Sequence, residues 1–288
     1  MTLTIALLAL GFLQEGAALP LLAPDLVVER REVRIEAGDV TLAATLYLPP
    51  GVQRPCPAVV QLHGSAPTVR EQQWWYYTRV ALNAGLAVLA YDKRGCGEST
   101  GSRLRFSVKT SPALLDELAG DAAAAHAWLR RQPGIDPERV GLIGGSQAGW
   151  IMPLVAERTE GVRFIVSGCG PTVSAGEEQF HERILAKGRS LAEADQALEE
   201  WDGARGYDPR ALLGRIETPI LWLFGERDDV IPTRACLAEL AKLHGRGRTN
   251  HAVHVFADAD HDFETSNGER ALLVPVVRIW LSKLGVLD

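Results

Sequence analysis

The sequence has little that would bind a metal ion or a polyanion. Its four cysteines, Cys56, Cys96, Cys169 and Cys236, are widely spaced and form neither a CxxC pair nor a cluster with histidine, which gives a metal site little support. The net charge of −6 and the lack of a basic run argue against nucleic acid and an anionic membrane surface as partners. We therefore expect a small, neutral or weakly charged ligand.

The sequence also lacks a hydrophobic run of transmembrane length. The apolar run from Leu3 to Leu13 is too short to span a bilayer as a helix. The small residues Gly16, Ala17 and Ala18 follow it, so residues 1–18 resemble a signal peptide cleaved near Ala18. We expect export to the periplasm or the medium. In an exported protein, a disulfide between two of the cysteines is the alternative to free thiols. Since no Lys or Arg precedes the run, an uncleaved cytoplasmic leader is the alternative.

The composition of the whole 288-residue chain, with 47% hydrophobic and 23% charged residues, is typical of one globular domain with an insertion. Val27 to Ile35 and Val40 to Leu48 alternate between apolar and polar residues. The turn signal Ala37-Gly38-Asp39 separates them. This pattern predicts an antiparallel opening hairpin at the start of a domain that covers residues 27–288.

Beyond the hairpin, short apolar runs alternate with longer helical patterns. This alternation predicts an α/β fold: a mostly parallel, doubly wound sheet with helices on both faces. The expected strands are Ala58–Leu62, Ala87–Tyr91, Val140–Ile143, Phe164–Val166, Ile220–Phe224 and His251–Phe256. The expected helices are Tyr76–Ala84, Leu114–Arg131, Ala148–Glu157 and Arg270–Leu284.

One stretch, Gly176 to Arg205, contains no strand pattern. It is rich in Glu, Ala, Lys, Arg and Gln, with apolar residues such as Phe180 and Ile184 at helical spacing. We interpret residues 171–213 as a small helical cap inserted between two core strands, where it would cover the active site. The alternative is an enlarged crossover helix without a role in binding.

The strongest chemical signal is the run Gly144-Gly145-Ser146-Gln147-Ala148-Gly149 between an expected strand and an expected helix. A serine on such a tight turn projects its hydroxyl away from the sheet, and small neighbours are needed around it. Ser146 is therefore the candidate nucleophile, although Ala148 stands where the second Gly of GxSxG is usual. The alternative, a phosphate cradle at a helix N-terminus, lacks the GxGxxG spacing of a dinucleotide site.

A serine nucleophile needs a general base and an orienting acid further along the chain. Asp228 and Asp229 both follow the expected strand Ile220–Phe224, and we favour Asp228 as the acid. His261 follows the last expected strand and is the candidate base. The sequence thus predicts the catalytic triad Ser146, Asp228 and His261.

Acyl transfer also needs two backbone N–H donors for the oxyanion, because losing one such donor typically costs about 100- to 1,000-fold in rate. We expect one donor to be the amide of Gln147, directly after the nucleophile. We expect the other to be the amide of Ser65, in the loop His63-Gly64-Ser65-Ala66-Pro67. The alternative for that loop is a simple turn.

Together, five segments resemble α/β-hydrolases of the bacterial carboxylesterase and serine-aminopeptidase-like type. They are His63–Ser65, Tyr91–Ser99, the Ser146 turn, Gly225–Pro232 and the His261 loop. The resemblance implies the triad named above, no cofactor, and ester hydrolysis through an acyl-enzyme. Relatives often have Gly where this chain has Ala66. Within Tyr91–Ser99 we interpret Asp92 and Arg94 as structural braces of the turn.

The substrate is less well defined by the sequence. Trp74, Trp75 and Trp150 lie near the motifs and are candidates for aromatic walls around an apolar acyl or alcohol group, or else core residues. Small to medium apolar esters are the first expectation. An aminopeptidase or amidase would want an acidic group in the cap, for which Glu177, Glu178 and Glu182 are candidates. A thioesterase, an acyltransferase and a non-catalytic binding protein are further alternatives.

Overall fold

The fold is built on one sheet. The computed structural model describes residues 28–287, with the exception of the side chains of residues 72–75. Within that part of the chain the sheet has eight strands in the order β1-β2-β4-β3-β5-β6-β7-β8. The strands are β1 (Glu29–Ala37), β2 (Val40–Leu48), β3 (Cys56–Leu62), β4 (Ala87–Tyr91), β5 (Ile135–Gly145), β6 (Ile165–Gly168), β7 (Ile220–Gly225) and β8 (His251–Phe256).

The pairing within the sheet changes from antiparallel to parallel at β4. The pairs β1·β2 and β2·β4 are antiparallel, and every pair from β4 to β8 is parallel. The opening hairpin turns at Gly38, whose φ of 64° suits a glycine. The predicted hairpin and mostly parallel sheet are therefore confirmed.

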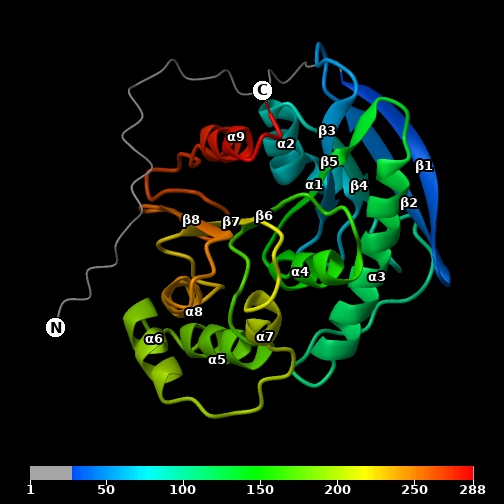
Figure 1. Ribbon diagram of the computed structural model, residues 1–288. Helices are drawn as coiled ribbons and strands as arrows, with labels where there is room; N and C mark the ends of the chain where they lie inside the picture. Colours follow the sequence, from blue (N-terminus) through cyan, green and yellow to red (C-terminus); the bar gives the residue numbers. More distant parts are fainter. Residues whose placement is uncertain (1–27, 288) are drawn as a thin grey trace.

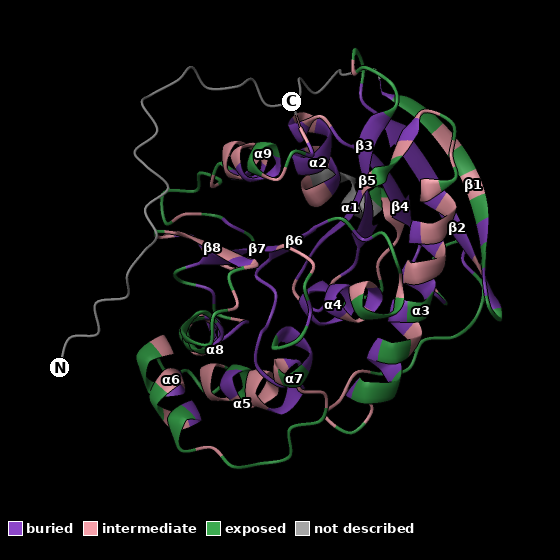
Figure 2. Ribbon diagram, viewed as in Figure 1, coloured by how far each residue is buried: buried purple, intermediate pink, exposed green. Residues whose placement is uncertain are grey.

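Helices cover both faces of the sheet (Figure 1). The helices α2 (Arg79–Ala84) and α9 (Leu273–Lys283) lie on one face, and α3 (Ser111–Arg130), α4 (Ala148–Arg158) and α8 (Thr233–Gly245) lie on the other. Successive strand residues alternate between the two faces, so Val59 packs with the first set and Val60 with the second. The strands that separate the two helical layers are almost wholly buried (Figure 2).

Two helical details differ from the sequence-based expectation. The helix α8 was not among the expected helices, although Cys236, Leu240 and Leu243 have helical spacing and are buried. The expected helix Tyr76–Ala84 is divided, because a short helix α1 (Arg70–Gln73) and a π-helical turn η1 (Trp74–Thr78) precede α2. A π-helical turn accommodates an extra residue and often occurs at functional sites.

Three helices lie between β6 and β7, namely α5 (Ala175–Leu185), α6 (Leu191–Glu199) and α7 (Arg210–Leu213). We call residues 171–213 the helical insertion. Capping boxes begin the first two helices: Ser174 with Glu177 in α5, and Ser190 with Glu193 in α6. The insertion lies beside α8 (Figure 1). Its interpretation as a cap over an active site stays a prediction.

The structure bears on two further expectations. All four cysteines are free thiols, and Cys56, Cys169 and Cys236 are buried. Between residues 28 and 287 no helix is both long and apolar enough for a membrane crossing. The expected signal peptide, residues 1–18, lies outside the described residues.

Candidate active site

The predicted catalytic residues all follow strands at the carboxyl edge of the parallel sheet. Ser146 follows β5, Asp228 follows β7 and His261 follows β8, while the His63 loop follows β3. Because parallel strands end at the same edge, their loops converge there, and this edge is where open α/β sheets bind ligands. The chain order therefore brings these segments to one side of the sheet.

Ser146 occupies a strained turn between β5 and α4. Its φ is 55°, in the left-handed region that a non-glycine residue rarely adopts, and such a conformation costs about 1–3 kcal/mol. Its N–H donates to the carbonyl of Gly168 at 2.9 Å. Residues 140–150 are buried except for Ser146, which is half-buried. The turn thus presents one hydroxyl at the surface of an otherwise buried segment.

The glycines around Ser146 are required by close packing. A Cβ at Gly145 would lie 2.1 Å from the Tyr77 hydroxyl, and one at Gly149 would lie 2.5 Å from the Cα of Gly170. Ala148, the departure from GxSxG, is fully buried. The absent side chain of Gly144 makes room for it, since a Cβ there would lie 2.7 Å from the Ala148 Cβ.

Asp228 and His261 form a direct acid–imidazole pair. Nδ1 of His261 lies 3.0 and 2.9 Å from the two carboxylate oxygens of Asp228. The carboxylate also accepts the amides of Val230 and Ile231 at 2.9 and 2.8 Å, and Asp228 is buried whereas Asp229 is exposed. Of the two candidate acids, the structure therefore brings Asp228 to the histidine.

The same contact controls the charge of the imidazole. Burial alone would lower the pKa of His261, but the hydrogen bond that it donates to Asp228 and the negative charge of that carboxylate outweigh burial and leave the pKa above its ordinary value. With Nδ1 engaged by the carboxylate, Nε2 is the nitrogen left to exchange a proton with a nucleophile.

The Ser146 hydroxyl is not hydrogen-bonded to His261 among the contacts of the described residues. The two segments are joined instead through β6, because Ser146 binds the carbonyl of Gly168 and the next residue, Cys169, reaches the acid–imidazole pair. Hydrogen bonds between catalytic groups are often loose in unliganded enzymes and tighten with substrate. The structure thus shows the Asp228–His261 pair assembled, and the contact of His261 with Ser146 stays a prediction.

Cys169 is a neighbour of the pair that the sequence analysis did not identify. Its Sγ, a carboxylate oxygen of Asp228 and a ring nitrogen of His261 all lie within 4.8 Å of one another. Burial and the Asp228 carboxylate raise the pKa of this thiol well above its ordinary value. As a thiol, Cys169 can donate a hydrogen bond to the Asp228 carboxylate, which is one of the influences that raise its pKa.

The two predicted oxyanion donors flank Ser146. A Cβ at Gly64 would lie 3.6 Å from the Ser146 Cβ, so the loop after β3 passes directly beside the nucleophile. In the part of the chain that is described, no protein acceptor binds the amide of Ser65 or that of Gln147. Free amides next to a serine are what an oxyanion hole needs. Their role as donors stays a prediction.

Lys93 holds this loop in place. It is buried, and its Nζ donates to the carbonyls of Gly64 and Ala66 at 2.6 and 3.2 Å and to Oε1 of Gln147 at 3.4 Å. Burial, followed by the charge of Arg103, lowers the pKa of Lys93 to about 8. One ammonium group therefore ties together the two segments that carry the candidate oxyanion donors.

The neighbours of Lys93 brace the turn as the sequence analysis interpreted them. Asp92 accepts the amides of Arg70 and Glu98 at 2.7 and 2.8 Å. Arg94 forms two hydrogen bonds of 2.7 and 2.8 Å with the buried carboxylate of Asp121 on α3. The sequence analysis assigned roles to these two residues but not to the lysine between them.

One of the three expected aromatic wall residues, Trp150, does not face a substrate pocket. Trp150 is a core residue: it is buried, its indole N–H donates to the carbonyl of Val173 at 2.9 Å, and it stacks on Phe106. The structure therefore corrects its assignment to the substrate pocket. The side chains of Trp74 and Trp75 lie outside the described residues. Tyr77, in contrast, packs against the nucleophile turn, with its hydroxyl 3.4 Å from the Gly168 carbonyl.

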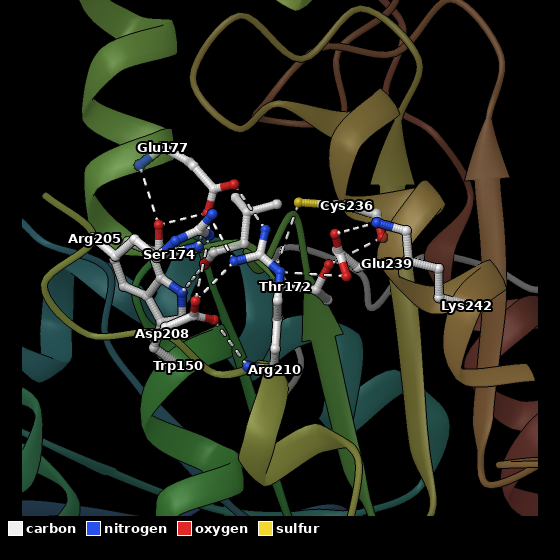
Figure 3. A network of polar contacts seen from close by, with 11 residues as sticks. Trp150, Thr172, Ser174, Glu177, Arg205, Asp208, Arg210, Cys236, Glu239 and Lys242 are labelled. Atoms are coloured by element: carbon white, nitrogen blue, oxygen red, sulfur yellow. Dashed lines mark hydrogen bonds and ion pairs between the residues drawn. The ribbon is translucent and has the colours of Figure 1, made fainter. Parts of the chain in front are cut away.

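A charged network anchors the helical insertion to α8 (Figure 3). Glu177, in the first turn of α5, binds both terminal nitrogens of Arg210 at 2.8 Å and also Arg205 at 3.2 Å. Arg210 continues to Glu239 on α8 at 3.3 Å. Burial opposes ionisation of Glu177, but Arg210 and the Ser174 cap prevail and lower its pKa to about 2.

A cavity of about 600 Å³ lies between the insertion and α8. Its wall includes Glu177, Arg210 and Trp201 together with Glu239 and Arg246. None of the three triad residues lines it. The cavity is therefore separate from the candidate active site, and the ion pairs described above form part of its wall.

Comparison with known proteins places the chain in a family. The sequence pattern of the prolyl oligopeptidase family matches residues 73–284. The chain belongs to this family. It is 27% identical over 268 residues to Esterase EstD of Thermotoga maritima, covering 81% of this chain and 61% of the esterase. It is 28% identical over 202 residues to the "Probable dipeptidyl-aminopeptidase B" of Fusarium vanettenii, covering 70% of this chain and 21% of that protein.

Solved structures agree on the fold. An esterase of Pyrococcus furiosus superimposes with a TM-score of 0.64 at 19% identity, covering 89% of this chain and 91% of the esterase. A dienelactone hydrolase of Anabaena variabilis gives a TM-score of 0.55 at 21% identity and covers 89% and 96% of the two chains. The fold is thus the α/β-hydrolase fold that the sequence motifs resemble. The curated relatives named above are longer, and the chain spans between a fifth and three fifths of their length.

Proposed function

We propose that this protein is a serine hydrolase that cleaves carboxylic esters of small to medium apolar substrates through an acyl-enzyme. The observation that carries the proposal is the presence, at one edge of the sheet, of a strained, half-buried Ser146 and of a buried Asp228 that is hydrogen-bonded to His261. The esterases among the sequence and structural relatives support this choice. No cofactor takes part in the reaction.

In the mechanism, His261 accepts the Ser146 proton as the hydroxyl attacks the acyl carbonyl. Asp228 fixes the imidazole tautomer and stabilises the imidazolium that forms. The amides of Gln147 and Ser65 bind the oxyanion of the tetrahedral intermediate. His261 then protonates the leaving alcohol, and the same groups activate water to hydrolyse the acyl-enzyme.

The test is turnover of p-nitrophenyl esters of increasing acyl length by the wild-type protein and by Ser146→Ala. We expect turnover by the wild type and a loss of about 10⁴-fold or more in the variant. Ser282→Ala is the matched control, because it makes the same chemical change at an exposed position of α9. Equal rates in the wild type and Ser146→Ala would rule out the proposed mechanism.

A peptidase or amidase is the second candidate function. The family match and the likeness to a protein named as a dipeptidyl-aminopeptidase favour it. Aminoacyl p-nitroanilides distinguish the two, since an esterase leaves them intact. Ser146-dependent release of nitroaniline would move the assignment to a peptidase.

We also propose export, from the leader-like residues 1–18. Sequencing the N-terminus of the mature protein tests this proposal, and retention of Met1 would contradict it.

A further inference from the structure

Three side chains of types that bind metal ions meet at the ends of neighbouring strands. Cys169 follows β6, Asp228 follows β7 and His261 follows β8, and these strands are consecutive in the sheet. Sγ of Cys169, a carboxylate oxygen of Asp228 and a ring nitrogen of His261 all lie within 4.8 Å of one another. The proposed mechanism uses the acid and the imidazole but not the thiol.

The spacing of the three atoms fits a tetrahedral zinc site. Thiolate, carboxylate and imidazole are all zinc ligands, and a water molecule can take the fourth position. With metal–ligand bonds of about 2.0–2.3 Å, the ligand atoms of such a site lie about 3.3–3.6 Å apart. Nδ1 of His261 already lies 3.0 and 2.9 Å from the carboxylate oxygens of Asp228. A small opening between the acid and the ring is therefore enough to admit the ion.

The backbone holds two of the three ligands in place. Cys169 has a φ of 46°, which a residue other than glycine rarely adopts, and its N–H donates to the carbonyl of Leu223 at 2.7 Å. Strain of this kind persists where the surroundings impose it, and it is found often at functional sites. The Asp228 carboxylate accepts the amides of Val230 and Ile231, and hydrogen bonds of this kind orient a metal-binding carboxylate.

The charges of the three groups balance those of a divalent cation. Burial, followed by the charge of Asp228, raises the pKa of the Cys169 thiol, so the free protein keeps this thiol protonated. A metal ion that binds a thiol displaces its proton. One thiolate, one carboxylate and one neutral imidazole then neutralise Zn²⁺, and a buried site is stable only when its charges are compensated in this way.

We propose that Cys169, Asp228 and His261 form a zinc site whose occupation inhibits the hydrolase. Zinc binds Sγ, one carboxylate oxygen and Nδ1; the thiol proton is released, and the ring proton moves from Nδ1 to Nε2. An imidazole protonated on Nε2 cannot accept the Ser146 proton. The side chain of His261 is 21% exposed, which provides an entry path for the ion. The inhibition rests on the proposed serine-hydrolase function, whereas binding of the ion does not.

A binding test needs no activity. Cadmium, a soft divalent ion whose bond to a thiolate absorbs in the ultraviolet, is titrated into Ser146→Ala and into double variants that add Cys169→Ser or Cys96→Ser. Cys96 is the matched control, because its thiol is less buried than that of Cys169. We expect the absorption in Ser146→Ala and with Cys96→Ser, and its loss with Cys169→Ser. Full absorption with Cys169→Ser, or loss only with Cys96→Ser, would overturn the proposal.

A kinetic test measures zinc inhibition of p-nitrophenyl ester hydrolysis, with each protein compared with its own rate in EDTA. Losing even an outer partner of a metal ligand typically costs about 10- to 100-fold in affinity. We therefore expect Cys169→Ser to need about 100-fold more zinc than the wild type for half inhibition, and Cys96→Ser to need the same amount. Because binding releases the thiol proton, inhibition of the wild type should strengthen as the pH rises.

Equal zinc sensitivity of the wild type and Cys169→Ser would overturn the proposal, even if Ser146-dependent hydrolysis is found. If no ester is hydrolysed, the proposed function fails and the cadmium titration still decides whether the site exists.

Thermal unfolding followed by circular dichroism checks that the variants are folded and gives a third measure of binding. A ligand that binds only the folded state raises the unfolding temperature. Zinc should therefore raise this temperature in the wild type and in Cys96→Ser but not in Cys169→Ser. A rise of the same size in Cys169→Ser would show that zinc binds elsewhere, which would contradict the assignment of the site.

Discussion

The residues at the sheet edge and the helical insertion are each held in place by a different set of contacts. At the edge, Asp228 is fixed by backbone amides and Ser146 by the carbonyl of β6. The insertion is joined to α8 by charged side chains, of which Glu177 and Arg210 are the centre, together with apolar packing and a hydrogen bond from the Thr172 hydroxyl to the Cys236 carbonyl. Backbone contacts between strand ends are rigid and local, whereas ion pairs are weakened by salt. The difference predicts that salt loosens the insertion more than the reaction centre.

The largest effect should come from Asp228→Asn. The change keeps the size of the side chain but removes the charge and offers an amide N–H to His261, which favours the wrong tautomer. We expect kcat for a p-nitrophenyl ester to fall about 10,000-fold. Asp229→Asn is the matched control, because Asp229 is exposed, and steady-state kinetics should show almost no change. Comparable losses in both variants would contradict the assignment of Asp228.

Lys93→Met should have the next largest effect. Methionine fills a similar volume but leaves the carbonyls of Gly64 and Ala66 without their donor. Misplacement of a catalytic group by about 1 Å can cost about 100-fold in rate, so we expect kcat to fall about 10- to 100-fold while KM changes little. Lys242→Met is the control, because the side chain of Lys242 is exposed on α8. An unchanged kcat in Lys93→Met would show that Lys93 does not position the oxyanion loop.

Glu177→Gln should act on the insertion rather than on the reaction centre. Losing a charged hydrogen-bond partner typically costs about 1.5–3 kcal/mol. Since the side chain of Arg210 is 26% exposed, we expect a free-energy cost near the lower end of that range. The cost should be seen as reduced hydrogen-exchange protection of the amides of α5. Protection in β5 should not change. Glu29→Gln, from an exposed ion pair on β1, should alter neither region. Uniform loss of protection over the whole chain would show that the insertion is not an independent unit.

The smallest effect concerns pH. The pKa of His261 lies above its ordinary value because the hydrogen bond and charge of Asp228 outweigh burial. The protonated imidazole cannot accept the Ser146 proton, so activity is lost as the pH falls through this raised pKa. The acidic limb of kcat/KM for a neutral ester should therefore have its midpoint above the ordinary value of 6.5. In Asp228→Asn the residual activity should have its midpoint at lower pH, and a midpoint that does not move would contradict the electrostatic account.

The sequence predicted those features that depend on position along a strand. Ser146, Asp228 and His261 each follow an apolar run, and parallel strands bring such positions to one edge. The sequence did not predict the residues whose roles depend on contacts between segments far apart in the chain. Lys93 appears in the sequence as one cation in a polar turn, and Cys169 as an isolated thiol.

In the insertion and in the helix after the nucleophile, neighbouring residues that look alike in the sequence also have different surroundings in the structure. Glu177 and Glu178 are equivalent in the sequence, and only the structure shows that Glu177 binds Arg210 while Oε2 of Glu178 has no hydrogen-bond partner among the described residues. Trp150 follows the nucleophile closely and so appeared to be a substrate contact. Trp150 packs into the core against Phe106, because Ser146 precedes α4 with a φ of 55° and its side chain does not follow the helical spacing that directs Trp150.

The most direct test of the central claim is covalent labelling by a fluorophosphonate, which reacts with an activated serine. The account predicts a single adduct in the wild-type protein, located on Ser146 by mass spectrometry of proteolytic fragments, and strongly reduced labelling in His261→Ala and Asp228→Asn. Labelling of a different serine, or labelling of Ser146 at the same rate in His261→Ala as in the wild type, would contradict it.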